Sequence, residues 1–176
     1  CTVKLINNDV LLLGCLYRSP NNSAHSNRLF MEMMNQMLNK HKYTHLLIVG
    51  DFNFPKIDWN NWSTTIENTE DPSNIFLEMI KDHYLYQHVQ HYTRGRGNDQ
   101  PHILDLILTN EEDMIENIEY QSPLGKSDHS VLKFTFKCYT LKATNNDTRY
   151  LYDRADYDKM RDNLHINWSM HLQGLE

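Results

Sequence analysis

Short apolar runs bounded by polar turns recur along most of the chain. The runs at 10–17, 45–50 and 103–108 are each brief and give way to polar or turn-forming residues, which favours buried β-strands over helices. Hydrophobic and polar residues alternate at 1–5 and at 131–136, which predicts two further strands. Because the first alternating segment opens the sequence, we expect the chain to start partway through a fold.

Two segments instead show the three- and four-residue spacing of an amphipathic helix. The first follows Ser26, a potential helix cap, and its apolar positions are Leu29, Phe30, Met33, Met34, Met37 and Leu38. The second starts at Asp71-Pro72-Ser73, and its apolar positions are Ile75, Phe76, Met79 and Ile80. The acidic segment 111–120 is compatible with a short helix or an edge segment. Strands that alternate with such helices predict an α/β layered domain.

The composition changes after Cys138. Residues 142–149 are polar and linker-like. Apolar residues then recur at helical steps, at Tyr157, Met160, Leu164 and Trp168. We therefore expect a compact domain at 1–139, a linker at 140–152 and a helical segment at 153–176.

Composition and charge indicate a globular domain and argue against several other classes of protein. With 176 residues, 40% of them hydrophobic, the chain has enough apolar material for one core. A formal charge of −6 is unusual for a nucleic-acid binder, but carboxylates gathered around a cation would make that total misleading. The three cysteines lack C-x-x-C spacing, which argues against a disulfide framework or a thiolate zinc site. No signal peptide or membrane-spanning run occurs, so we expect an intracellular protein without a membrane partner.

Polar residues suited to catalysis follow the predicted strand at 45–50. Asp51 and Asn53 come next, and residues two apart in an extended chain point the same way. A carboxylate and an amide so placed can activate water and support a developing anion. Gly-Asp-x-Asn is also common turn chemistry, so a purely structural turn is the alternative.

Two further carboxylates and a histidine lie near the later strands. Asp128 and His129 precede the strand at 131–136; carboxylates suit Mg²⁺ or Mn²⁺, and a histidine can bond phosphate. A turn cap is the structural alternative for both. Asp105 lies within the apolar run ILDLIL, where an unpaired buried carboxylate would cost several kcal/mol. We predict that His129 pairs with it, unless Asp105 lies on an edge strand and faces solvent.

Candidate phosphate contacts are less specific. Tyr17 closes the strand at 10–17 and could contact a phosphate, although a tyrosine there is more often a boundary residue of the core. Arg18, Arg94 and Arg96 are the basic residues best placed for a phosphate backbone, with solvated loops as the alternative. The other histidines show no metal-binding spacing.

Taken in order, four motifs resemble the endonuclease/exonuclease/phosphatase superfamily. They are Tyr17 before a proline turn, GDFN at 50–53, LDLILTN at 104–110 and SDH at 127–129. The longer segments LGCLYRSP, IVGDFNFPKIDW and PLGKSDH are similar to the apurinic-type endonuclease domain of non-LTR (LINE-like) retrotransposons. The tail, YDRADYDKMRDNLHINW, is similar to the segment that joins this endonuclease to a reverse transcriptase.

This resemblance implies a four-layer α/β sandwich of two mixed β-sheets flanked by helices. It also implies a DNA endonuclease that depends on Mg²⁺ or Mn²⁺, acts in the nucleus and needs no small-molecule cofactor beyond the metal. The partner would be duplex DNA, nicked to leave a 3′-hydroxyl that primes reverse transcription. A reverse-transcriptase domain on the same polyprotein would be a second partner.

The resemblance gives a role to each matched residue. Asp51 would act on the attacking water, with Asn53 beside it on the phosphate. Asp128 would bind or support the metal, and His129, oriented by Asp105, would stabilise the pentacoordinate phosphorane. The remaining candidates for contact with phosphate or DNA are Tyr17, Arg18, Asn21, Asn22, Arg94, Arg96 and Ser127.

One departure from the family pattern bears on activity. In the family an Asn and a metal-binding Glu come from strands before the one that ends at Tyr17, and here no Glu precedes Tyr17. We therefore expect 1–139 to be the C-terminal portion of an N-terminally truncated domain, with weakened metal binding and impaired nicking. The alternatives are an inactive retrotransposon remnant that binds DNA or protein, and a relative that acts on another phosphodiester or phosphomonoester, such as an inositol lipid.

Overall fold

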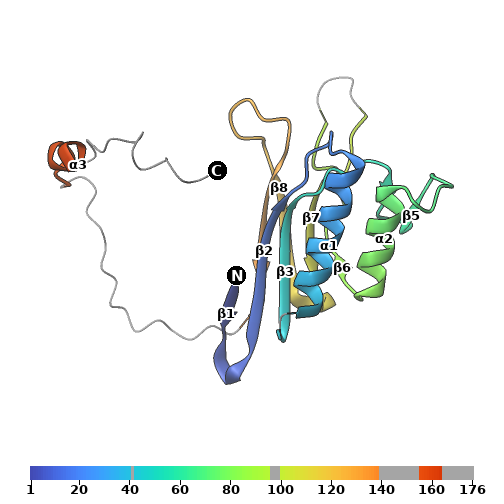
Figure 1. Ribbon diagram of the computed structural model, residues 1–176, viewed down its shortest axis with the longest axis horizontal. Coiled ribbons are helices and arrows are strands. Elements are labelled where there is room, and N and C mark those ends of the chain that lie inside the picture. Colours follow the sequence, from blue (N-terminus) through green and yellow to red (C-terminus); the bar gives the residue numbers. More distant parts are fainter. Residues whose placement is uncertain (41, 96–99, 139–154, 164–176) are drawn as a thin grey trace. The chain divides into compact units, whose positions relative to one another are not determined.

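The structure, a computed structural model, describes residues 1–40, 42–95, 100–138 and 155–163 (Figure 1). The chain divides into two compact units, residues 1–141 and 142–176. The larger unit contains the described residues of the predicted site, and its core lies between Leu5 and Cys138.

A mixed five-stranded sheet forms the centre of the larger unit. Its strand order is β1-β2-β3-β7-β6. The neighbouring strands β2 and β3 are parallel, and the other neighbouring pairs are antiparallel. The bounds are Thr2–Lys4 for β1, Val10–Tyr17 for β2, His45–Asp51 for β3, Tyr86–Gln87 for β6 and Asp105–Thr109 for β7.

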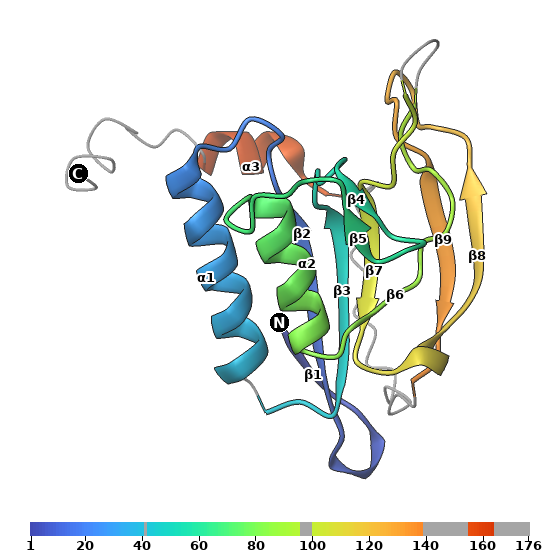
Figure 2. The ribbon, with the colours of Figure 1, turned by 90° about the vertical axis from the view of Figure 1, so that its right-hand side faces the viewer.

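Two helices cover one face of this sheet (Figure 2). They are α1 (Ala24–Lys40) and α2 (Pro72–Asp82), and both were predicted from their apolar spacing. The Asp71 side chain caps α2 by accepting a 2.8 Å hydrogen bond from the backbone N–H of Ser73. The helices and the sheet enclose a core that includes Leu12, Met34, Ile48, Phe52, Phe76, Ile80, Leu106 and Leu108.

A β-hairpin covers the opposite face (Figure 2). Its strands are β8 (Ile115–Gln121) and β9 (Val131–Phe136), paired antiparallel with an irregularity between Glu116 and Glu119. A second apolar cluster joins it to the sheet and includes Leu11, Leu47, Val89, Ile107, Ile115, Leu132 and Phe134. The described residues of this unit thus form helix, sheet and hairpin layers, and mixed β-structure flanked by helices confirms the predicted fold class.

The structure refines several predicted segments. The acidic segment at 111–120 divides into a 3₁₀ turn, η2 (Glu112–Met114), and most of β8. A second 3₁₀ turn, η1 (Ile6–Asn8), separates β1 from β2. The two-residue strands β4 (Ile57–Asp58), β5 (Ser63–Thr64) and β6 were not predicted.

The smaller unit contains one described helix, α3 (Tyr157–Asn163). It includes the first two of the predicted apolar positions, whereas Leu164, Trp168 and the predicted linker at 140–152 lie outside the described residues. None of the helices that the structure describes has the length and apolar character of a membrane span.

Candidate active site

Three predicted site residues lie side by side at one end of the five-stranded sheet. Parallel pairing places Tyr17 of β2 beside Asp51 of β3, and antiparallel pairing places Asp51 beside Asp105 of β7. Successive side chains of a strand point to opposite faces. Leu47 and Ile107 alternate in phase with the two carboxylates and belong to the cluster beneath the hairpin. The two carboxylates therefore face the side of the sheet that the hairpin covers.

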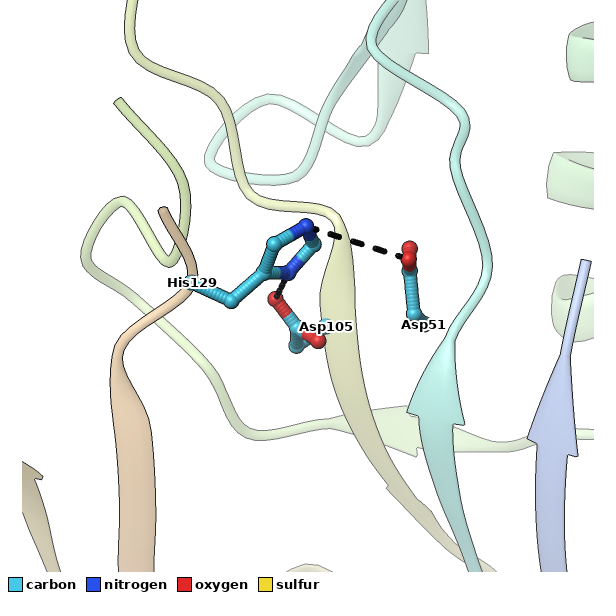
Figure 3. A group of neighbouring side chains, drawn as sticks. All are labelled: Asp51, Asp105 and His129. Carbon is cyan, nitrogen blue, oxygen red and sulfur yellow. Dashed lines mark hydrogen bonds and ion pairs between the residues drawn. The ribbon is translucent and has the colours of Figure 1, made fainter. Parts of the chain in front are cut away.

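His129 reaches the same place from the hairpin layer. It lies just before β9, where its backbone forms an isolated antiparallel bridge with Arg94. Its Nδ1 is 2.8 Å from Asp105 Oδ2, and its Nε2 is 3.9 Å from Asp51 Oδ2 (Figure 3). An ionised carboxylate only accepts hydrogen bonds, so Nδ1 carries the proton and Asp105 orients the ring. The pairing of Asp105 with His129 that the sequence predicts is therefore present.

The Asp51 carboxylate is held by Asn53. The side-chain Nδ2 of Asn53 donates to Asp51 Oδ2 at 2.7 Å and to the carbonyl oxygen of Arg18 at 2.9 Å, while its backbone N–H donates to Asp51 Oδ1 at 3.1 Å. Asn53 is buried and adopts a φ of 51°, a left-handed conformation that asparagine tolerates better than most residues. The two side chains meet through a turn, as in the structural alternative, and not along an extended strand.

Gly50 allows this turn to follow directly on the strand. Its φ is +146°, which L-residues rarely adopt. A Cβ at this position would lie 1.8 Å from the carbonyl oxygen of Leu16 on the neighbouring strand. Only glycine therefore fits immediately before Asp51.

Arg18 supports the same turn from within. It is only 7% exposed, and it stacks over the ring of Phe54 with 4.1 Å between Cζ and the ring centroid. Its Nη1 donates to the carbonyl oxygen of Asn53 at 2.8 Å, and its Nε donates to Asn27 Oδ1 at 3.0 Å. Burial lowers the pKa of Arg18, and the charge of Asp51 opposes that shift. This buried setting differs from the phosphate contact predicted for Arg18, because its Nη1 already serves the Asp51–Asn53 turn and its Nε already donates to Asn27.

Burial and charge act together on Asp51. Burial raises its pKa, the nearby charge of Asp105 raises it further, and His129 and the hydrogen bonds from Asn53 act against both. A carboxylate with a raised pKa is a better proton acceptor. Ligand atoms of Asp51, Asp105 and His129 lie within 4.8 Å of one another, which is close enough to share one metal ion. Two neighbouring carboxylates that repel each other fit a divalent cation, which would offset the repulsion.

Asp128 is paired with Arg94. Its Oδ2 lies 2.8 Å from Nε of Arg94, and this hydrogen bond is the largest cause of a pKa below the usual value for Asp128. Among the described residues Asp128 is not part of the group that could share an ion. The structure thus brings together two side chains, Asp128 and Arg94, for which the sequence predicted separate roles in metal and DNA binding.

A profile of the endonuclease-reverse transcriptase family matches residues 11–133, a region that contains Tyr17, Asp51, Asp105 and His129. The chain belongs to this family. Among solved structures, the endonuclease domain of TRAS1, a telomere-specific non-LTR retrotransposon, is similar to it at 16% sequence identity and a TM-score of 0.53. The similarity covers 74% of this chain and 56% of that chain, and at this identity it establishes the fold. A comparison with curated proteins finds no match.

The structure also describes four further predicted residues, Tyr17, Asn21, Asn22 and Ser127. Tyr17 is 69% exposed at the end of β2. Asn21 and Asn22 lie in the turn after it, closed by a 3.3 Å hydrogen bond from the backbone N–H of Asn22 to the carbonyl oxygen of Ser19. The Ser127 hydroxyl accepts from the backbone N–H of His129 at 3.1 Å. Arg96 lies outside the described residues.

One buried residue near the site, Thr93, was not predicted from the sequence. Thr93 is 1% exposed, and its hydroxyl contacts the backbone at the start of β7. A threonine in a polar segment rich in arginine and glycine is read as part of an exposed loop. The apolar pattern at 103–108 also does not indicate that the N–H groups of Leu104 and Asp105 need a side-chain acceptor.

Proposed function

We propose that this chain carries the hydrolytic centre of a Mg²⁺-dependent DNA endonuclease that nicks a target duplex for retrotransposition. The observation that carries this proposal is the meeting of Asp51, Asp105 and His129 at one end of the sheet, from two layers and three distant parts of the sequence. Membership of the endonuclease-reverse transcriptase family supports it.

The chemistry follows from the positions of these groups. Asp51, with its raised pKa, accepts a proton from the attacking water. Asp105 accepts from Nδ1–H of His129 and orients the ring, so that Nε2 lies on the Asp51 side and donates to the reacting phosphate when the ring carries both protons. The exposed phenol of Tyr17, beside Asp51 in the sheet, donates to a phosphate oxygen.

Mg²⁺ or Mn²⁺ would be held by oxygens of Asp51 and Asp105, with Asp128 as a further ligand if it leaves Arg94. When bound, the ion would offset phosphate charge and lower the pKa of water. Mg²⁺ prefers about six oxygen ligands, and this group supplies two carboxylates and an imidazole. We therefore expect weak metal affinity and slow nicking by the 176-residue chain.

The substrate in this proposal is duplex DNA, contacted through the segments that bear Arg94, Asn21 and Asn22. A nick that leaves a 3′-hydroxyl would serve a reverse-transcriptase domain on the same polyprotein, in the nucleus. The family joins an endonuclease to a reverse transcriptase, and TRAS1 is a non-LTR retrotransposon with an endonuclease domain, which supports this assignment.

A plasmid-nicking assay with the full chain in Mg²⁺ or Mn²⁺ tests the proposal. Asp51→Asn and His129→Gln should each reduce nicking about 10²- to 10⁴-fold, the contribution typical of a general acid–base group. Matched controls are Asp113→Asn, on the exposed η2 turn, and His83→Gln, at the end of α2. Nicking that survives both site substitutions would overturn the assignment.

Two other outcomes point to the alternatives. DNA binding without cleavage in either metal would favour the non-catalytic binding module. Hydrolysis of a soluble phosphomonoester or an inositol lipid, with plasmid left intact, would favour a different phosphate ester as substrate.

A further inference from the structure

Thr93 lies in the segment between β6 and β7 and is buried with 1% of its surface exposed. Its hydroxyl oxygen accepts two hydrogen bonds from the backbone at the start of β7, from the N–H of Leu104 and the N–H of Asp105, each at 3.0 Å. One side chain therefore fixes the backbone on both sides of the peptide that leads into Asp105.

The backbone of the same residue is bonded to the other layer. The carbonyl oxygen of Thr93 accepts a 2.7 Å hydrogen bond from the N–H of Ser130, the residue after His129. The next residue, Arg94, forms the isolated bridge to His129 and the ion pair with Asp128. The Thr93 hydroxyl thus holds the segment that bears Asp105, and the Thr93 carbonyl oxygen holds the segment that bears His129. The side chains of these two segments form the Asp105–His129 hydrogen bond.

We propose that Thr93 is a positioning residue that sets the geometry of the Asp105–His129 pair. The proposal rests on the proposed nuclease function for its kinetic consequence and on geometry alone for its structural one. The N–H groups of the buried Leu104 and the half-buried Asp105 need an acceptor, and without the hydroxyl the start of β7 must move to find another. Such a movement shifts the Asp105 carboxylate, while the backbone bond to Ser130 still holds the His129 segment.

A purely structural role would predict lower stability without an effect on the pair. The substitutions Thr93→Val and Thr93→Ser separate the two roles. Valine keeps the shape of threonine and removes the acceptor, whereas serine keeps the acceptor and removes a methyl group. Thr109→Val is a matched control, because Thr109 is a fully buried threonine at the other end of β7 whose hydroxyl bonds His88 and Glu111.

The first measurement is the proton resonance of the His129 Nδ1–H group, recorded on ¹⁵N-histidine-labelled full chain. The protein has ten histidines, so the resonance is assigned by its disappearance in His129→Gln. We expect the downfield, exchange-protected signal of a carboxylate-bonded Nδ1–H in the wild type, in Thr93→Ser and in Thr109→Val. We expect it to be lost or shifted upfield in Thr93→Val. This readout needs no nuclease activity, so it stands even if the proposed function fails.

The second measurement is the kinetics of plasmid nicking. In Thr93→Val we expect kcat to fall about 10- to 100-fold with KM unchanged, because a small displacement of a catalytic group reduces the rate more than binding. Thr93→Ser should recover kcat, and Thr109→Val should leave it unchanged.

An unchanged Nδ1–H signal in folded Thr93→Val would overturn the proposal, as would its loss in folded Thr93→Ser. If Thr93→Val does not fold, the serine variant and hydrogen exchange in the wild type decide. Slow exchange of the Leu104 and Asp105 amides supports the two hydrogen bonds to Thr93, and fast exchange in the folded protein refutes them.

Discussion

At the scale of single residues, the proton on His129 is the most sensitive feature of the site. Asp105 fixes this proton on Nδ1 because its carboxylate can only accept, at an Nδ1–Oδ2 distance of 2.8 Å. An amide at the same position can donate as well as accept. It can therefore stabilise the wrong tautomer of the ring without changing the shape of the site.

Asp105→Asn should accordingly lower the rate of nicking by about 10⁴-fold, on the scale seen where a carboxylate orients a catalytic histidine. The measurement is single-turnover nicking of a plasmid, with the thermal unfolding midpoint recorded to verify the fold. Asp113→Asn makes the same chemical change at an exposed position and should leave the rate unchanged. A variant with Asn at 105 that nicks at the wild-type rate would show that Asp105 does not orient the ring.

A second histidine links stability to pH. His88 Nε2 lies 2.7 Å from Thr109 Oγ1, and the Thr109 hydroxyl already donates to the carbonyl oxygen of Glu111, so Nε2 is the donor. Burial lowers the pKa of His88 below its ordinary value of 6.5. Below that ordinary value the unfolded chain takes up a proton that the folded chain resists. The stabilisation is therefore present above the ordinary pKa and is lost as pH falls toward the lowered one.

We expect the free energy of unfolding to decrease between about pH 7.5 and about pH 5.5, and to decrease less in His88→Gln, because glutamine has no such proton to bind. Urea unfolding at a series of pH values measures this. His25→Gln, at an exposed position of α1, should follow the wild-type curve. Parallel curves for the wild type and His88→Gln would contradict the argument.

The sequence predicted the pairing of Asp105 with His129, but it did not predict the buried residues that hold the surrounding backbone. Asp105 could be paired with His129 beforehand, because a carboxylate in an apolar run needs a partner. Arg18 and Thr93 could not be placed, since both lie in segments that read as exposed turns. Their burial depends on Phe54 and on the start of β7, which meet them only in the folded chain.

At the scale of elements, the junction between β3 and the following turn depends on Gly50. A methyl group there would meet the carbonyl oxygen of Leu16 at 1.8 Å, in a conformation with positive φ. Two well-paired strands would have to separate to admit it. The junction therefore joins the parallel pairing of β2 with β3 to the position of Asp51.

Gly50→Ala should lower the free energy of unfolding by at least about 3 kcal/mol, since both backbone strain and a steric clash act on a paired strand. Gly125→Ala is the control: it also has positive φ, at +60°, but a Cβ there has nothing within 4 Å. Its effect should be about 1 kcal/mol. Urea unfolding of both variants tests the difference, and equal effects would show that the contact with Leu16 does not matter.

Most of the long elements could be predicted from periodicity, and the short ones could not. The apolar runs at 10–17 and 45–50 correspond to β2 and β3, because both strands are buried and end at turns. A two-residue strand such as β6 has no period to detect, and its pairing with β7 arises from the fold. The sequence pattern also did not predict that β8 and β9 form a separate layer over the opposite face of the sheet.

At the scale of the whole molecule, the described core belongs to the larger unit. Both apolar clusters consist of residues between Leu5 and Cys138. The similarity to the TRAS1 endonuclease domain spans only 56% of that chain. The stability of the unit itself can be tested directly.

A chain that ends at residue 141 should unfold cooperatively, with a midpoint within about 3 °C of the full chain, the shift that roughly 1 kcal/mol would cause. Differential scanning calorimetry of both chains provides the comparison. A loss several times larger would show that residues 142–176 contribute to the core.

The three central side chains come from positions 51, 105 and 129, and the last of them precedes β9. During synthesis on a ribosome, the carboxylates would emerge well before the imidazole. A nascent chain can therefore bring the three side chains together only when the hairpin has left the exit tunnel and closed over the sheet. The order of the strands along the chain therefore makes the meeting of these three side chains a late step in the folding of the larger unit.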